Sequence, residues 1–172
     1  MRARFAAGIS IGLVWLAWCA PSTALADAPR TLFIVRHAEK DSGENPALTV
    51  AGRARAQTLA RMLHDARIRV IVVSEWKRTQ QTAAPLAQAL GIVPRIVRVH
   101  LPRELRALPP GTRALVVSHS HLIPHIVPAL GCGAAPPVGD LEYDRLYVLT
   151  LASDGSCEAT LLRYGAPSAR GG

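Results

Sequence analysis

Residues 32–40 read LFIVRHAEK, in which four apolar residues lead directly into Arg36 and His37. The apolar half is typical of a strand that is buried on both faces of a sheet. Such a strand would deliver the two polar side chains to the sheet's edge. The stretch therefore predicts a central strand with a binding or catalytic pair at its carboxyl end.

Strand-like runs alternate with helix-like patterns along the rest of the chain. We expect strands at 31–35, 69–73, 92–99 and 114–117, helices at about 51–66, 77–90 and 122–130, and a closing hairpin at 145–151 and 157–164. This alternation predicts an α/β fold, a three-layer sandwich whose mostly parallel central sheet carries helices on both faces. The hairpin is expected to add antiparallel strands at one edge.

The first 26 residues have the layout of a secretory signal peptide. Arg2 and Arg4 precede an apolar run over 5–20, and residues 24–26 (Ala-Leu-Ala) form a small-x-small cleavage pattern. The apolar run is short for a membrane span of about 20 residues, which favours cleavage over an uncleaved anchor. We therefore expect one mature domain, residues 27–172, periplasmic or secreted and without a stable membrane anchor after cleavage.

The positive net charge is typical of a basic solvated surface, and attraction to anions such as phosphate is its functional interpretation. The formal charge is +8 for the whole chain and would be +6 without Arg2 and Arg4. Most of it comes from arginine, whose planar guanidinium suits phosphate oxygens. The arginines are scattered, and form neither the basic stripe nor the amphipathic helix expected of a nucleic-acid or lipid-docking protein. We expect a phosphorylated small molecule or envelope component as the substrate, and no nucleic-acid partner.

Two cysteines, Cys132 and Cys157, remain in the predicted mature domain. In an exported chain they are compatible with one disulfide. Two buried, unpaired thiols fit the sequence equally well, so both states stay open at this point.

Polar clusters follow three of the predicted strands. Arg36 and His37 follow the first strand, Arg78 lies in the segment after the second, and His119 follows the fourth. Ligands in open α/β sheets bind beyond the carboxyl ends of the strands, so these four side chains are expected to meet. Guanidiniums can grip phosphate oxygens, and a neutral imidazole can attack phosphorus. The arrangement predicts phosphoryl transfer.

The segments RHAEK, SEWKRTQQTA and LVVSHSHLIP resemble, in this order, the three signature segments of the histidine phosphatase superfamily, also called phosphoglycerate mutase-like. The resemblance implies that His37 is the phosphorylated nucleophile, that Arg36 and Arg78 clamp the phosphate, and that His119 steadies the phosphoryl group. It also implies a phosphatase that hydrolyses phosphomonoesters through phosphohistidine, with no metal and no cofactor. One departure is His121, where many members carry Asn.

The three segments do not supply the acid that protonates the leaving oxygen. In larger members of the superfamily a Glu from an insertion after the third strand has this role. Glu104 is the nearest candidate here, with Glu39, Asp41 and Glu44 in the first loop as rivals. A solvated helix position is the alternative for Glu104.

Two other interpretations of the cluster stay open. His119, His121 and His125 are candidate metal ligands, because His121 and His125 are four residues apart on a predicted helix, although no further ligand lies nearby in the sequence. The alternative function is a catalytically inactive module of the same fold that binds a phosphate-containing ligand. The sequence carries no signal for the oligomeric state.

Overall fold

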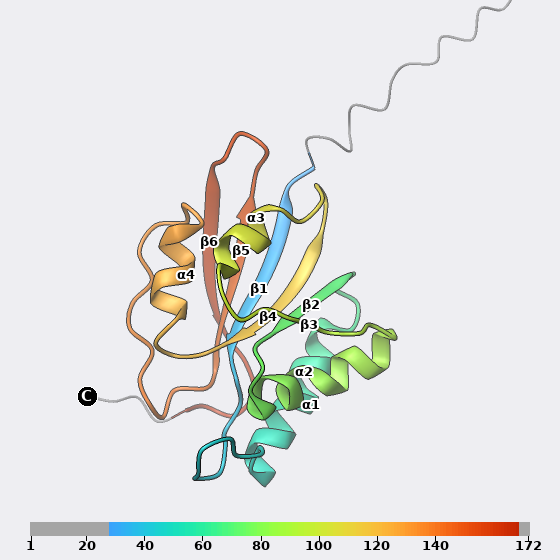
Figure 1. The fold of residues 1–172 in the computed structure, drawn as a ribbon, viewed down its shortest axis with the longest axis vertical. Coiled ribbons are helices and arrows are strands. Elements are labelled where there is room, and N and C mark those ends of the chain that lie inside the picture. Colours follow the sequence, from blue (N-terminus) through green and yellow to red (C-terminus); the bar gives the residue numbers. More distant parts are fainter. Residues whose placement is uncertain (1–27, 169–172) are drawn as a thin grey trace, which may run out of the picture.

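Six strands and four helices alternate through residues 28–168, the part of the chain that the computed structural model describes (Figure 1). The elements are β1 (Arg30–Arg36), α1 (Val50–Leu63), β2 (Val70–Val73), α2 (Lys77–Leu90), β3 (Arg95–Ile96), α3 (Leu101–Arg106), β4 (Arg113–Ser118), α4 (Ile123–Ala129), β5 (Arg145–Leu151) and β6 (Cys157–Arg163). None of the helices described is long and apolar enough to cross a membrane. The predicted signal peptide, residues 1–26, lies outside the described residues.

The strands form one mixed sheet in the order β3-β2-β4-β1-β5-β6. The first four strands in this order are parallel, β5 pairs antiparallel with β1, and β6 pairs antiparallel with β5. The predicted mostly parallel sheet with an antiparallel hairpin at its edge is confirmed. In the β1–β4 register Arg36 lies opposite Ser118, so these two central strands end at the same level.

Two apolar layers hold helices against the two faces of the sheet (Figure 1). Leu59 of α1 and Leu86 of α2 pack on one face. Leu105 of α3 and Ile126 of α4 pack on the other. Successive residues of β1 contribute to alternate layers because side chains of a strand point to opposite faces. Burial on both faces explains why the strand reads as a continuous apolar run and confirms the predicted three layers.

The predicted elements agree with the structure except at β3, and the short helix α3 was not among the helices expected from the sequence. The weak strand expected over 92–99 is reduced to Arg95–Ile96, which pairs only with β2 at the sheet's edge. Pro94 has no backbone N–H to donate to a ladder, so it limits the strand on its N-terminal side. In contrast, α2 runs over Lys77–Leu90 as expected and accommodates Pro85 in its interior.

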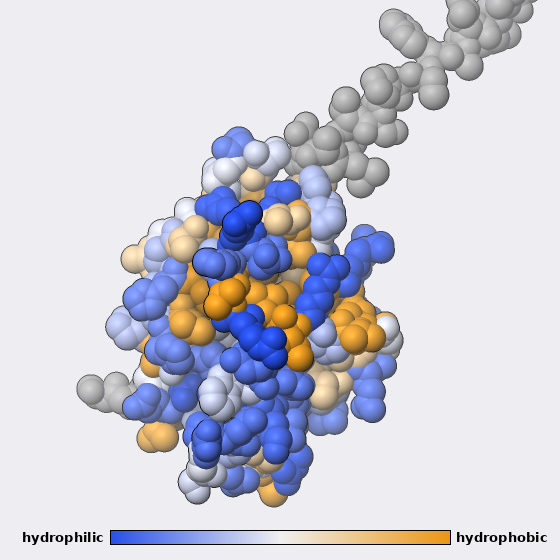
Figure 2. All heavy atoms as spheres, in the orientation of Figure 1, coloured by the Kyte–Doolittle hydropathy of each residue, from blue (hydrophilic) through white to orange (hydrophobic). Residues whose placement is uncertain are grey.

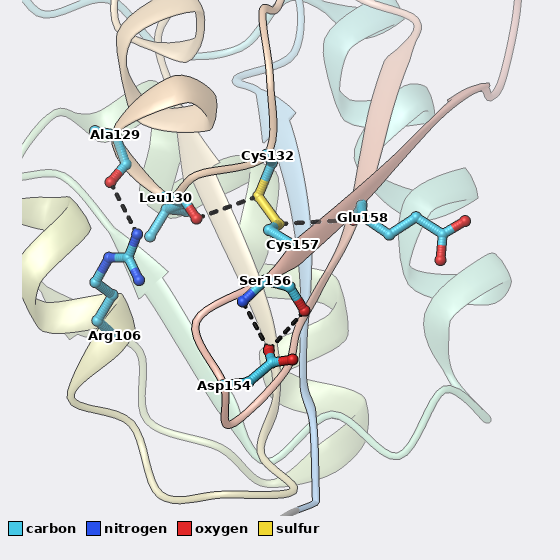
Figure 3. Close-up of a disulfide and its surroundings, with 8 residues drawn as sticks. All are labelled: Arg106, Ala129, Leu130, Cys132, Asp154, Ser156, Cys157 and Glu158. Carbon is cyan, nitrogen blue, oxygen red and sulfur yellow. Dashed lines mark hydrogen bonds between the residues drawn. A yellow bond between two sulfur atoms is a disulfide. The ribbon is translucent and has the colours of Figure 1, made fainter.

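Cys132 and Cys157 form a disulfide with a Cα–Cα distance of 4.7 Å (Figure 3). The structure thus decides between the two states that the sequence left open. The bond joins the loop after α4 to the first residue of β6. Nearby, the turn between β5 and β6 is closed by Asp154, which accepts hydrogen bonds from the backbone N and the Oγ of Ser156 (Figure 3).

Candidate active site

The carboxyl ends of β1, β2 and β4 carry the side chains that were predicted to meet there. His37 and His119 directly follow the paired residues Arg36 and Ser118. Their ring centroids lie 5.5 Å apart. Arg78, in the first turn of α2, places its Nη2 3.5 Å from His119 Nδ1. The structure therefore brings Arg36, His37, Arg78 and His119 together in one site.

His37 is buried and held in a single tautomer. Its Nδ1 lies 2.8 Å from the carbonyl oxygen of Ala38. Because a carbonyl only accepts, Nδ1 carries the proton and Nε2 carries the lone pair. Burial, reinforced by the positive charge of Arg36, lowers the pKa of His37 to about 3. The ring is therefore neutral at physiological pH, in the form that can attack phosphorus.

A chain of hydrogen bonds fixes His119 in the opposite tautomer. Thr79 Oγ1 donates to a main-chain carbonyl 2.9 Å away and accepts from Ser74 Oγ at 2.9 Å. Ser74 Oγ in turn accepts from His119 Nε2 at 3.0 Å, which leaves Nδ1 to face Arg78. Burial, followed by the charge of Arg78, lowers the pKa of His119 to about 4. His119 is thus a neutral donor through Nε2.

Arg36 is oriented by main-chain carbonyls of the 139–144 loop, the last part of the connection from α4 to β5. Its Nη1 donates to the carbonyls of Gly139, Asp140 and Glu142 at 2.8, 2.9 and 3.2 Å. Its guanidinium lies 4.1 Å from the centroid of the Tyr143 ring. Its Nε is buried and has no partner among the described residues. That N–H remains available for an anionic ligand.

Arg78 also keeps a buried guanidinium nitrogen without a hydrogen-bond partner among the described residues. This nitrogen is Nε, and the guanidinium lies 4.7 Å from the centroid of the Trp76 ring. An unmade hydrogen bond from a buried donor is costly. Two such donors, one on each guanidinium, flank the two neutral histidines. The donor set fits a phosphate group, because guanidinium N–H groups match its oxygens in number and geometry.

A cavity of about 280 Å³ opens beside His119. It lies between the ends of β2 and β4, the segment 97–101 and the residues before α4. Arg78 and Glu75 also line it. The negative charge of Glu75 acts on both Arg78 and His119, which places this carboxylate close to the phosphate-binding groups.

The structure places the four candidate acids elsewhere. Glu104 is exposed on α3 and is not among the residues that line the cavity. Glu39 is committed to Arg55, which donates to it from Nη2 at 2.7 Å and from Nε at 2.9 Å. Asp41 and Glu44 are exposed in the loop after β1. The sequence offered one signal for Glu75, its position two residues after the end of β2, but its role could not be read from that position.

The histidines considered as metal ligands are arranged differently. The rings of His119 and His121 stack, with centroids 5.6 Å apart and planes inclined by 18°. Over residues 28–168, no group of three or more His, Cys, Asp or Glu side chains is placed to hold a metal ion.

Comparisons with known proteins agree with this architecture. Residues 32–102 match the model of the histidine phosphatase superfamily, branch 1. No curated protein sequence matches the chain. Among solved structures, the protein histidine phosphatase SixA, complexed with tungstate, is 21% identical with a TM-score of 0.65, and the match covers 77% of this chain and 96% of SixA.

Two mycobacterial structures are similar over comparable lengths. Mycobacterial hydrolase 1 is 17% identical with a TM-score of 0.59, covering 81% of this chain and 99% of its own. Mycobacterial glucosyl-3-phosphoglycerate phosphatase is 16% identical with a TM-score of 0.57, and the match covers 80% of this chain and 99% of that phosphatase. The predicted resemblance to the histidine phosphatase superfamily is confirmed, and the chain has the phosphoglycerate mutase-like fold of that superfamily.

Proposed function

We propose that the protein is an exported phosphatase that hydrolyses phosphomonoesters through a phosphohistidine on His37, without a metal. One observation carries the proposal: a neutral His37 presents Nε2 beside two guanidiniums that each hold a buried, unpaired N–H. The chemistry needs a lone pair for attack and donors for the phosphate oxygens, and this site offers both.

In the first step the phosphate dianion is held by Arg36, Arg78 and His119. His37 Nε2 attacks phosphorus in line with the ester oxygen, so the N–P bond forms as the P–O bond breaks. The His119 Nε2–H, now directed at Ser74, turns to a phosphate oxygen and stabilises the charge that spreads over the group in transfer.

The leaving oxygen takes up a proton as it departs. Glu75 and Glu104 are both exposed, but only Glu75 lines the cavity together with His119 and Arg78. We therefore assign the donor role to Glu75 in its protonated form. In the second step water attacks phosphorus, the N–P bond breaks, and inorganic phosphate leaves with neutral His37 restored. Glu75, now ionised, accepts the proton of that water.

Export is supported by two independent features. The leader pattern of residues 1–26 is one. The disulfide between Cys132 and Cys157 is the other, because such bonds persist in oxidising compartments. A periplasmic or secreted enzyme would meet phosphorylated metabolites or envelope components, and these are the substrates that we propose.

The test compares the mature protein with His37→Ala and with His125→Ala, which changes an exposed histidine of α4. Wild type and His125→Ala should release phosphate from 4-nitrophenyl phosphate, and His37→Ala should not. A radiolabelled substrate should leave an acid-labile, base-stable adduct on wild type alone. Equal turnover in wild type and His37→Ala would refute the proposed phosphatase activity through His37. Tight vanadate binding without turnover would favour the inactive phosphate-binding module.

A further inference from the structure

The cavity beside His119 shares two residues with the proposed phosphate site. Its lining includes Arg78 and His119 but neither Arg36 nor His37. The cavity therefore lies beside two groups that would hold the phosphoryl group and is not lined by the nucleophile. In-line displacement sends the leaving group away from the attacking nitrogen, so a bound ester would direct its alcohol part into this space.

One part of the cavity wall is apolar. Val72 and Val116 come from β2 and β4, and Val97, Leu101 and Leu122 close it from the segment before α3 and the start of α4. Figure 2 shows apolar surface in the middle of this view, interrupted and surrounded by hydrophilic side chains. The polar residues of the lining, besides Arg78 and the two histidines, are Ser74, Glu75, Arg98 and Ser118. Hydroxyl groups of a sugar that face the valine and leucine side chains instead would stay unpaired, which weakens binding.

Aromatic surfaces complete the cavity. The His121 ring stacks on His119 and lines the cavity together with Trp76. These flat surfaces suit an aromatic ring, which prefers offset-stacked or edge-to-face contacts. The volume of about 280 Å³ is just below the range of about 300–1,000 Å³ usual for ligand pockets. The space therefore suits one compact group.

We propose, on the basis of the proposed function, that the preferred substrate is a phosphomonoester of a compact aromatic alcohol, whose ring occupies this cavity against His121 and Val97. His121 is then a residue that determines specificity. It presents a ring where many members of the superfamily carry the smaller amide of Asn.

The experiment compares three esters of primary alcohols, so that the reactivity of the leaving oxygen is similar. Benzyl phosphate carries a ring, glucose 6-phosphate a polar ring, and glycerol 3-phosphate a small polar group. We expect kcat/KM for benzyl phosphate to exceed that for each of the other two by at least tenfold. Comparable values for the three, or a faster reaction with a phosphohistidine peptide, would overturn the inference while leaving the phosphatase proposal intact.

Two variants test the cavity itself. His121→Asn and Val97→Asn should each lower kcat/KM for benzyl phosphate at least tenfold more than for glycerol 3-phosphate. Val99→Asn is the matched control, since Val99 is 68% exposed and does not line the cavity. Because Val97 also packs against the core, the exposed His121 keeps the test valid if Val97→Asn fails to fold. An unchanged selectivity in His121→Asn refutes the inference, whereas no hydrolysis of any ester by wild type, 4-nitrophenyl phosphate included, refutes the phosphatase.

Discussion

At the scale of single residues, Arg36 illustrates how the site prepares a phosphate clamp. Three main-chain carbonyls hold Nη1, and Tyr143 covers the guanidinium plane. These contacts use one nitrogen and one face, so the buried Nε stays free. A planar group with several donors can be anchored and still bind a ligand, which an ammonium cannot do with the same geometry.

Arg36→Lys is therefore expected to be a severe change although it keeps the charge. Loss of one positioned donor in an anion-stabilising site lowers turnover by about 100-fold, and we expect kcat/KM to fall by at least that factor. Steady-state kinetics on 4-nitrophenyl phosphate would measure it. Arg103→Lys, at an exposed position on α3, is the control, and equal effects of the two substitutions would contradict the role of Arg36.

The proton donor can be identified by its dependence on the leaving group. A general acid contributes about 10²–10⁴-fold, and the contribution is largest for poor leaving groups. Glu75→Gln should thus lower kcat/KM about 100-fold for benzyl phosphate and much less for 4-nitrophenyl phosphate. If Glu104→Gln showed that selective loss and Glu75→Gln did not, Glu104 would be the donor.

At the scale of elements, most strands and helices were predictable because burial leaves a regular pattern of apolar residues in the sequence. Apolar runs mark the strands that are covered on both faces, and Arg36, His37, Arg78 and His119 could be placed at one edge because parallel strands end together. The orientation of Arg36 could not be predicted. It depends on the main-chain carbonyls of Gly139, Asp140 and Glu142. Because every residue has such a carbonyl, the sequence does not show which ones accept from Arg36.

The 139–144 loop owes its conformation to a buried carboxylate. Glu142 accepts from Arg145 and Arg163 at 2.6 and 2.7 Å, and from the backbone N of Gly139 at 3.2 Å. Despite its burial, these hydrogen bonds lower the pKa of Glu142 to about 2. The ion pairs therefore link the start of β5 and the end of β6 to the loop that holds Arg36.

Glu142→Gln should loosen this loop. Removing one partner of a buried ion pair typically costs about 3 kcal/mol, so the free energy of unfolding should fall by about that amount in urea denaturation. The KM for a phosphomonoester should rise as well, because Arg36 loses its fixed orientation. Glu158→Gln, on the exposed edge strand, should change neither quantity. A stable variant with normal KM would show that the loop does not depend on Glu142.

At the scale of the whole molecule, the two buried histidines make the fold sensitive to acid. The pKa values of His37 and His119, about 3 and about 4, lie below the ordinary value of 6.5. Below pH 6.5 the unfolded chain therefore binds protons that the folded chain does not. Stability is full above pH 6.5 and is lost as the pH falls toward these folded values.

Denaturant unfolding at pH 7.0 and pH 5.5 would measure this loss. At one unit below 6.5, each histidine contributes a loss of about 1.4 kcal/mol. Since a small part of that loss is already present at pH 7.0, His119→Gln should lose about 1.2 kcal/mol less than wild type between the two pH values. An identical loss in both proteins would mean that His119 takes up its proton in the folded state.

The disulfide also determines how the molecule responds to a protease. Cys132 and Cys157 enclose the 139–144 loop and β5 in a covalent ring. A single cut in the exposed stretch between α4 and β5 would leave both fragments joined through sulfur, and β5 would still be paired with β1 and β6. Nicked protein would run as one species on a denaturing gel without thiol and as two species with it, so the ring allows the chain to be cleaved without being divided.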